Sequence, residues 1–132
     1  MGNNILTINK LNYEDVNFSI KQNHIIINTL PDSLQDCLIL NTLNIKEEEN
    51  IINNCLKKNK NSIIIIYGKN CTDKSVFTKH QQLIELGFTN VNIYIGGMFE
   101  WLLMQDIYGE DEFPTTKREL DILKYKSDSL FN

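Results

Sequence analysis

Hydrophobic and polar positions follow one another in blocks that predict strands and helices in turn. The runs HIIINT (24–29) and SIIIIYG (62–68) are short and continuously apolar, which is typical of strands buried on both faces of a parallel sheet. Residues 91–95 form a further strand-like run and residues 37–43 a weaker one, while residues 6–8 form a candidate edge strand. Several of these runs are bounded by glycine, proline or asparagine.

The segments between these runs carry helix signals. Asn12 can cap a helix through residue 18, and NIKE (44–47) has the form of a capping box before an amphipathic helix. A periodic helix follows residue 75, with Val76, Phe77, His80, Leu83 and Ile84 near one face, and Gly87 ends it. Residues 98–105 form an apolar helix, and a second capping box, TKRE (116–119), opens a terminal helix through residue 124.

Strands that alternate with helices predict one α/β domain with a mainly parallel central sheet flanked by helices. The chain has 132 residues, which is enough for one sizeable core. We expect residues 1–126 to form this domain, including a C-terminal helical extension, and residues 127–132 to fray.

The charge and hydropathy of the chain argue against two classes of partner, nucleic acids and membranes. The net charge is −4, and Lys57, Lys58 and Lys60 form only a short basic cluster at a helix end, so we expect no nucleic-acid partner. No apolar segment approaches the roughly 20 residues that span a bilayer, and the first ten residues do not form a secretory signal. We therefore expect no membrane partner.

Cysteine usage indicates a reducing compartment. Cys37, Cys55 and Cys71 are widely spaced and form no CxxC pair, so we expect no disulfide framework, metal or cofactor, and a cytoplasmic or other intracellular location. The chain has no alanine and a single arginine, and Ile, Asn and Lys abound, which indicates an AT-rich genome. Some parasites, protists and large DNA viruses have such genomes, and a viral source would allow a place in the virion.

A polar loop lies between the run SIIIIY and the helix after residue 75. In α/β proteins, strand, loop and helix N-terminus together form the usual place for a ligand, because loop amides and the helix dipole favour a negative charge. One hypothesis is a small anion held by this loop, and the other is a solvated loop with a helix cap from Thr72 or Asp73. The candidate residues are Gly68, Lys69, Asn70, Cys71, Thr72, Asp73, Lys74 and Ser75.

Three motifs in order resemble the rhodanese-like domain family over roughly residues 6–105. They are the Tyr67-Gly68 strand end, GFTNV (87–91) and GGMFEW (96–101). The resemblance implies the rhodanese fold and an active-site loop in which a cysteine directly follows the strand-ending tyrosine. In the family, that cysteine is the nucleophile that carries sulfur in a sulfurtransferase reaction.

Departures from the family pattern indicate a lost catalytic site. Gly68 stands where the family has its nucleophile, and the nearest basic residue to the family's loop arginine is Lys74. The family's Asp-x-Arg after the first core strand is here Asn28-Thr29-Leu30. We therefore interpret the chain as a catalytically inactive rhodanese-like module with a binding, structural or regulatory role. We expect it to bind an unknown protein partner or to associate with itself.

The alternative is a sulfurtransferase that uses Cys71 as a displaced nucleophile. The helix N-terminus and Lys69 or Lys74 would favour a thiolate at Cys71. It lies three residues beyond the family position, however, and this displacement favours an incidental loop cysteine over a nucleophile. A third interpretation is a cysteine phosphatase on a related fold. The span 68–74 has the length of a phosphatase loop but lacks the cysteine at its start and the arginine at its end.

The remaining chemical side chains are expected to pack rather than react. We assign this role to His80, Cys37, Cys55, Phe99 and Trp101. His24 has no evident acidic partner in the sequence. Tyr108 and Phe113 lie near or beyond the end of the usual domain, and they either complete the core or form an exposed aromatic patch for a partner.

Overall fold

The apolar runs form one parallel sheet in the computed structural model, which describes residues 8–131. The strands are β1 (Asn9–Leu11), β2 (Ile25–Asn28), β3 (Ile64–Tyr67) and β4 (Val91–Tyr94). They lie in the order β1-β4-β3-β2, and every pair is parallel. All four residues of β3 and of β4 are buried, as their position in the middle of the sheet requires.

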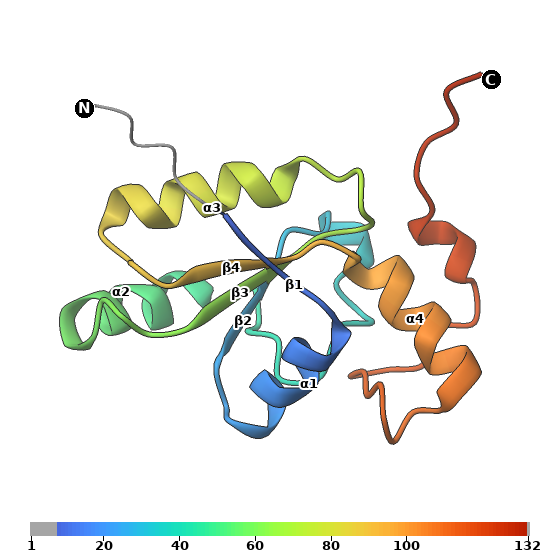
Figure 1. Cartoon of the computed structure of the whole chain (residues 1–132), viewed down its shortest axis with the longest axis horizontal. Helices are drawn as coiled ribbons and strands as arrows, with labels where there is room; N and C mark the ends of the chain where they lie inside the picture. The colour runs from blue at the N-terminus through green and yellow to red at the C-terminus, as the bar shows by residue number, and fades with distance from the viewer. Residues whose placement is uncertain (1–7, 132) are drawn as a thin grey trace.

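Within residues 8–131, four α-helices cover both faces of this sheet (Figure 1): α1 (Tyr13–Lys21), α2 (Glu48–Lys58), α3 (Ser75–Leu86) and α4 (Gly97–Tyr108). On one face, α1 and α4 contribute Val16 and Trp101 to a cluster that includes Tyr67 of β3. On the other face, α2 and α3 contribute Ile52 and Leu83. The predicted α/β class with helices flanking a parallel sheet is confirmed. In the part of the chain that the structure describes, no helix is long and apolar enough to cross a membrane.

The strand register aligns the carboxyl ends of three strands. Tyr67 of β3 is paired with Asn28 of β2 on one side and with Tyr94 of β4 on the other. The segments that follow these strands therefore begin side by side, at Thr29, at Gly68 and at residues 95–97. Ligand sites of open α/β sheets lie at this edge, so the fold places the candidate loop where the sequence predicted it.

The chain after α4 turns back and completes the core. A single antiparallel bridge pairs Ile39 with Thr115, and Phe113 packs against Trp101 with ring centroids 5.1 Å apart. The segment ends in a short 3-10 helix, η2 (Ile122–Tyr125), which contacts α4. Because Phe113 and Tyr125 are both buried, the segment is part of the domain.

The predicted terminal helix over residues 116–124 is wrong. The Thr116 hydroxyl does not cap a helix; it donates to the Asp36 carbonyl and accepts the Leu38 amide. These tertiary contacts hold the segment in an irregular course, and of residues 116–131 only η2 is helical.

Other element boundaries also differ from the prediction. Asn12 forms the expected N-cap, in a full capping box with Asp15, but α1 continues to Lys21. Asn44 accepts the amide of Lys46 in a local turn, so α2 begins only at Glu48. The first strand lies at Asn9–Leu11 rather than at residues 6–8, of which 6 and 7 lie outside the described residues. Residues 37–43 form two isolated bridges instead of a strand.

Candidate functional site

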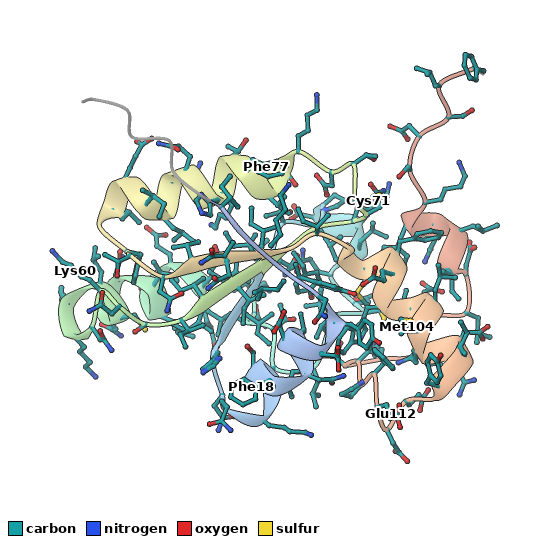
Figure 2. All side chains as sticks on the ribbon, in the orientation of Figure 1. Phe18, Lys60, Cys71, Phe77, Met104 and Glu112 are labelled. Carbon is teal, nitrogen blue, oxygen red and sulfur yellow. The ribbon has the colours of Figure 1, made fainter. Side chains whose placement is uncertain are left out.

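Residues 68–75 connect β3 to α3 and form one side of an open cavity of about 420 Å³. Its other lining residues come from the segment after β2 and from the C-terminal segment: Thr29, Pro31, Lys126 and Asp128. Six of the eight candidate residues line this cavity, but Gly68 and Cys71 do not. Figure 2 shows Cys71 on the loop between β3 and α3, near the start of that helix.

The carboxylate of Asp73 accepts hydrogen bonds from two backbone amides and one hydroxyl of the loop. The Lys69 amide donates to Asp73 Oδ2 at 2.8 Å, and the Ser75 amide donates to Oδ1 at 3.0 Å. The Ser75 hydroxyl also donates to Oδ1, at 2.6 Å. Asp73 thus accepts the amide of Ser75, the first residue of α3, whereas the N-cap residue Lys74 makes no side-chain cap.

These contacts stabilise the ionised form of Asp73. Partial burial opposes ionisation, but the hydrogen bonds from Ser75 and Lys69, together with the positive charge of Lys69, outweigh it. The pKa of Asp73 therefore lies below its ordinary value. The loop already contains one anion, which the chain itself supplies.

Gly68 has no space for a side chain. A Cβ atom built on Gly68 would lie 2.5 Å from Asp73 Oδ2 and 2.9 Å from Val76 Cγ1. The backbone of Gly68 is not in the left-handed region, so glycine is needed here because of the close approach of Asp73 and Val76. The missing side chain at Gly68 and the inward carboxylate of Asp73 therefore fit each other.

The three cysteines have different surroundings. Cys71 is exposed, and its thiol takes part in none of the hydrogen bonds found among residues 8–131. Cys37 is buried and its thiol donates to the Lys117 carbonyl, while Cys55 is half-buried against the α2–α3 side of the core. The expected packing roles of Cys37 and Cys55 fit these positions.

The burial of the other side chains named in the sequence analysis shows which of them belong to the core. His80 is buried on α3, where burial lowers its pKa more than a hydrogen bond with the Val91 backbone raises it. Phe77, expected on the same inward face, is 38% exposed. Phe113 is 2% exposed and belongs to the core, whereas Tyr108 is 59% exposed.

The start of α4 forms hydrogen bonds with two backbone carbonyls of the loop. The amides of Met98 and Phe99 donate to the carbonyls of Gly68 and Lys69, at 2.9 and 3.0 Å. Gly97 permits this approach, since its φ is +67° and a Cβ there would lie 2.8 Å from the Gly68 carbonyl oxygen. The sequence marked the glycine pair as a motif but gave no sign of this contact.

The C-terminal segment fixes the middle of the loop. The buried side chain of Asn70 donates to the Tyr125 carbonyl at 2.9 Å, and it accepts the amide and hydroxyl of Thr72. The Thr72 hydroxyl also lies 3.1 Å from Ser127 Oγ. Sequence reasoning missed this connection because no local pattern links residues so far apart in the chain.

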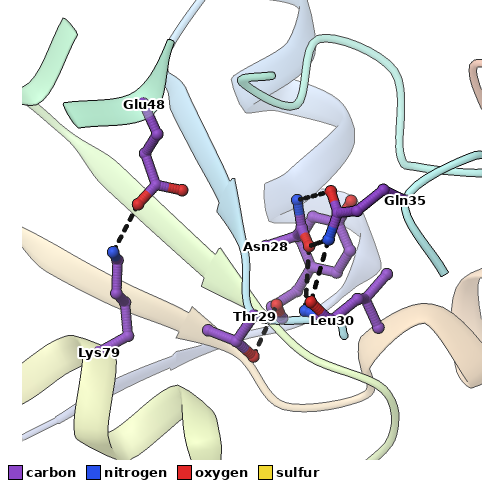
Figure 3. Close-up of polar contacts among 7 residues, drawn as sticks. Asn28, Thr29, Leu30, Gln35, Glu48 and Lys79 are labelled. Atoms are coloured by element: carbon purple, nitrogen blue, oxygen red, sulfur yellow. Dashed lines mark hydrogen bonds and ion pairs between the residues drawn. The ribbon is translucent and has the colours of Figure 1, made fainter. Parts of the chain in front are cut away.

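The end of β2 forms an uncharged network beside the loop. Figure 3 shows Asn28 bound to Gln35, which follows the 3-10 helix η1 (Asp32–Leu34): Gln35 Nε2 donates to Asn28 Oδ1 at 2.8 Å. The same Oδ1 accepts the Leu30 amide at 3.0 Å. The Thr29 hydroxyl lies 2.7 Å from the Ser75 hydroxyl, and this contact ties the network to the loop.

A comparison with models of protein families assigns the chain to one family. The model of the rhodanese-like domain matches residues 19–104, which is more than half of the sequence. The chain therefore belongs to the rhodanese-like domain family, and the family resemblance is confirmed. The matched region contains the candidate loop but ends before the returning C-terminal segment.

Solved structures agree on the fold. The rhodanese-like domain of the Alr3790 protein from Anabaena sp. matches with a TM-score of 0.55 and 17% identity, over 96% of this chain and 89% of that chain. The BH2092 protein from Bacillus halodurans matches with a TM-score of 0.58 and 19% identity, over 76% and 74%. A thiosulfate sulfurtransferase from Pseudomonas aeruginosa matches with a TM-score of 0.56 and 17% sequence identity, over 71% of this chain and 18% of that chain. The comparison with curated proteins found no match.

Proposed function

We propose that this rhodanese-like domain does not transfer sulfur and acts as a binding, structural or regulatory module. One observation carries the proposal: the position directly after β3 has no side chain, and Asp73 and Val76 fill the space that a side chain would need. Nucleophilic catalysis needs a nucleophile beside donors that stabilise the developing anion. Here the nucleophile is missing and two of the donors are bound to Asp73.

The alternative is sulfur transfer through Cys71. An exposed thiol is accessible to a sulfur donor, but the amides of Lys69 and Ser75, which would stabilise an anion in this loop, already bind Asp73. Cys71 also does not line the cavity beside the loop. These positions support the inactive module over the alternative.

Exposed apolar side chains support a binding role. Ile107, Tyr108, Leu120 and Leu123 are all well exposed, and they lie at the end of α4 or in the segment around η2. This region follows the part of the chain that matches the family model. The binding role itself, to a protein partner or a second copy, stays a proposal.

Steady-state kinetics test the absence of sulfur transfer. The donor is thiosulfate, whose outer sulfur would pass to a thiolate with release of sulfite, and the acceptor is cyanide, which would become thiocyanate. We expect no thiocyanate above the reagent blank from wild type or from Cys71→Ser, with an active sulfurtransferase as the positive control. Turnover by wild type that Cys71→Ser abolishes would replace our proposal with the alternative.

A further inference from the structure

We propose that Asp73 is a built-in anionic ligand of the loop and that it excludes free oxyanions such as sulfate and thiosulfate from the amides of Lys69 and Ser75. This inference rests on the proposed function, because it describes how the same site is kept closed. It also makes a positive statement: without the Asp73 carboxylate, the loop becomes an oxyanion site.

The contacts of Asp73 are those that a bound oxyanion would make. Its two oxygens are bound from opposite ends of the loop, Oδ2 by the Lys69 amide and Oδ1 by the Ser75 amide and hydroxyl. All three contacts are charge-assisted and between 2.6 and 3.0 Å long. Sulfate presents the same kind of charged oxygen pair, so the same donors would suit it.

An internal carboxylate has a large advantage over a free anion. Asp73 lies only four residues after Lys69 and two before Ser75, so its effective concentration at these amides is far above that of a dissolved ligand. A free anion would also have to enter against the negative charge of Asp73. Wild type is therefore closed to oxyanions at ordinary concentrations.

The rest of the loop is held by contacts that do not involve Asp73. The carbonyls of Gly68 and Lys69 accept amides from the start of α4, and Asn70 is bound to the C-terminal segment. Removal of the carboxylate should therefore leave the amides of Lys69 and Ser75 in place and without a partner. Their exposure to an added anion is then the expected result, rather than collapse of the loop.

Positive charge around the cavity would favour that anion. Lys69, Lys74 and Lys126 line the cavity, and none of them takes part in the ion pairs found among the described residues. With Asp73 neutralised, Asp128 is the only acidic side chain left in the lining described by the structure. The site would have the sign and the donors for a small dianion.

A sulfate titration followed by ¹H–¹⁵N spectra and by thermal unfolding tests the inference. The variants are Asp73→Ala and, as matched control, Asp128→Ala, which removes the same charge from the same cavity but none of the described hydrogen bonds to the loop. Sodium chloride at equal ionic strength controls for screening. We expect saturable shifts of the Lys69 and Ser75 amides and a rise in Tm of about 5 °C in Asp73→Ala alone.

Two results would overturn the inference. One is saturable sulfate binding at these amides in wild type or Asp128→Ala as tight as in Asp73→Ala. The other is a folded Asp73→Ala protein whose amides do not respond to sulfate. If Asp73→Ala does not fold, Asp73→Ser decides in its place at the Lys69 amide alone, because serine can still accept the Ser75 amide but has no second oxygen for the Lys69 amide.

The outcomes separate this inference from the proposed function. A wild-type protein that binds sulfate but has no turnover contradicts the inference alone. Turnover through Cys71 in a protein whose loop still excludes sulfate contradicts the proposed function alone. Thiosulfate in place of sulfate in the same titration shows whether the opened site accepts a sulfur donor.

Discussion

At the scale of single residues, Gly68 and Asp73 behave as one unit. Gly68 leaves a space at the end of β3, and the Asp73 carboxylate fills it while accepting the loop amides. A change at either position should therefore depend on the residue at the other. Residues in direct contact commonly show such coupling, by about 0.5–3 kcal/mol.

A double-mutant cycle in urea measures this coupling. Gly68→Ala should lower the free energy of unfolding by about 1–3 kcal/mol, since its methyl group would meet Asp73 and Val76. In the Asp73→Ala background the same change should cost about 1 kcal/mol less, because only the Val76 contact remains.

Asp128→Ala provides the control background for the cycle. Asp128 lines the same cavity, but the atoms nearest to a Cβ at Gly68 belong to Asp73 and Val76, so Gly68→Ala should keep its full cost there. Equal costs of Gly68→Ala in all three backgrounds would show that Asp73 does not occupy the space beside Gly68.

At the scale of elements, the start of α4 and the loop after β3 form one backbone contact. Two α4 amides bind two loop carbonyls, and Gly97 lies directly against the loop backbone. The start of α4, with Gly97 at the point of contact, therefore helps to set the position of the loop. A substitution at Gly97 should therefore affect the loop more than a substitution at a glycine with positive φ that does not contact the loop.

Gly97→Ala and Gly87→Ala compare two glycines with positive φ, +67° and +117°. A Cβ at Gly97 would lie 2.8 Å from a backbone oxygen, while the nearest atom to a Cβ at Gly87 would be a Lys60 side-chain carbon at 3.7 Å, an ordinary contact. We expect a loss of unfolding free energy of about 3 kcal/mol for Gly97→Ala and about 1 kcal/mol for Gly87→Ala, measured in urea. Similar losses would mean that conformational strain alone, and not contact with the loop, makes Gly97 necessary.

Elements with strong local signals were predicted well. The continuous apolar runs gave β2, β3 and β4 within a residue or two, and Gly87 ends α3 in the left-handed conformation, with φ of +117°. The terminal helix was predicted wrongly because the capping residue Thr116 instead bonds to the segment near Asp36. A tertiary contact there overrides a local preference.

The position of the candidate loop between a strand and a helix was predicted from the sequence, but its contacts were not. The end of a buried strand followed by a helix was sufficient to locate the loop. Two features depend on side-chain direction and on distant contacts: the carboxylate of Asp73 beneath Gly68, and the bond from Asn70 to Tyr125. A capping aspartate and a loop asparagine are common in any sequence, so neither feature has a sequence signal of its own.

At the scale of the whole molecule, the returning C-terminal segment is part of the site. It lies beyond the region that matches the family model, yet it supplies buried Tyr125 and the acceptor for Asn70. The loop is thus enclosed by α4 on one side and by this segment on another. Its rigidity should depend on residues that are about fifty positions away in the chain.

Two truncations test this dependence. A chain that ends at residue 121 lacks η2 and Tyr125, and we expect its Tm to fall by about 10 °C, with faster amide exchange in the loop at Asn70–Thr72. A chain that ends at residue 127 keeps η2 and Ser127, and its Tm should stay within about 2 °C of the full-length value. Equal behaviour of the two shortened chains would contradict a supporting role for η2.

The central claim is that the loop has lost its sulfur chemistry, and intact mass after incubation with thiosulfate tests it most directly. A sulfur adduct would precede any turnover, so its absence also excludes a slow enzyme whose acceptor is unknown. We predict an unchanged mass for wild type and for Cys71→Ser, under conditions in which an active sulfurtransferase gains one sulfur atom. A gain of one sulfur by wild type that is absent from Cys71→Ser would contradict the account and assign the chemistry to Cys71.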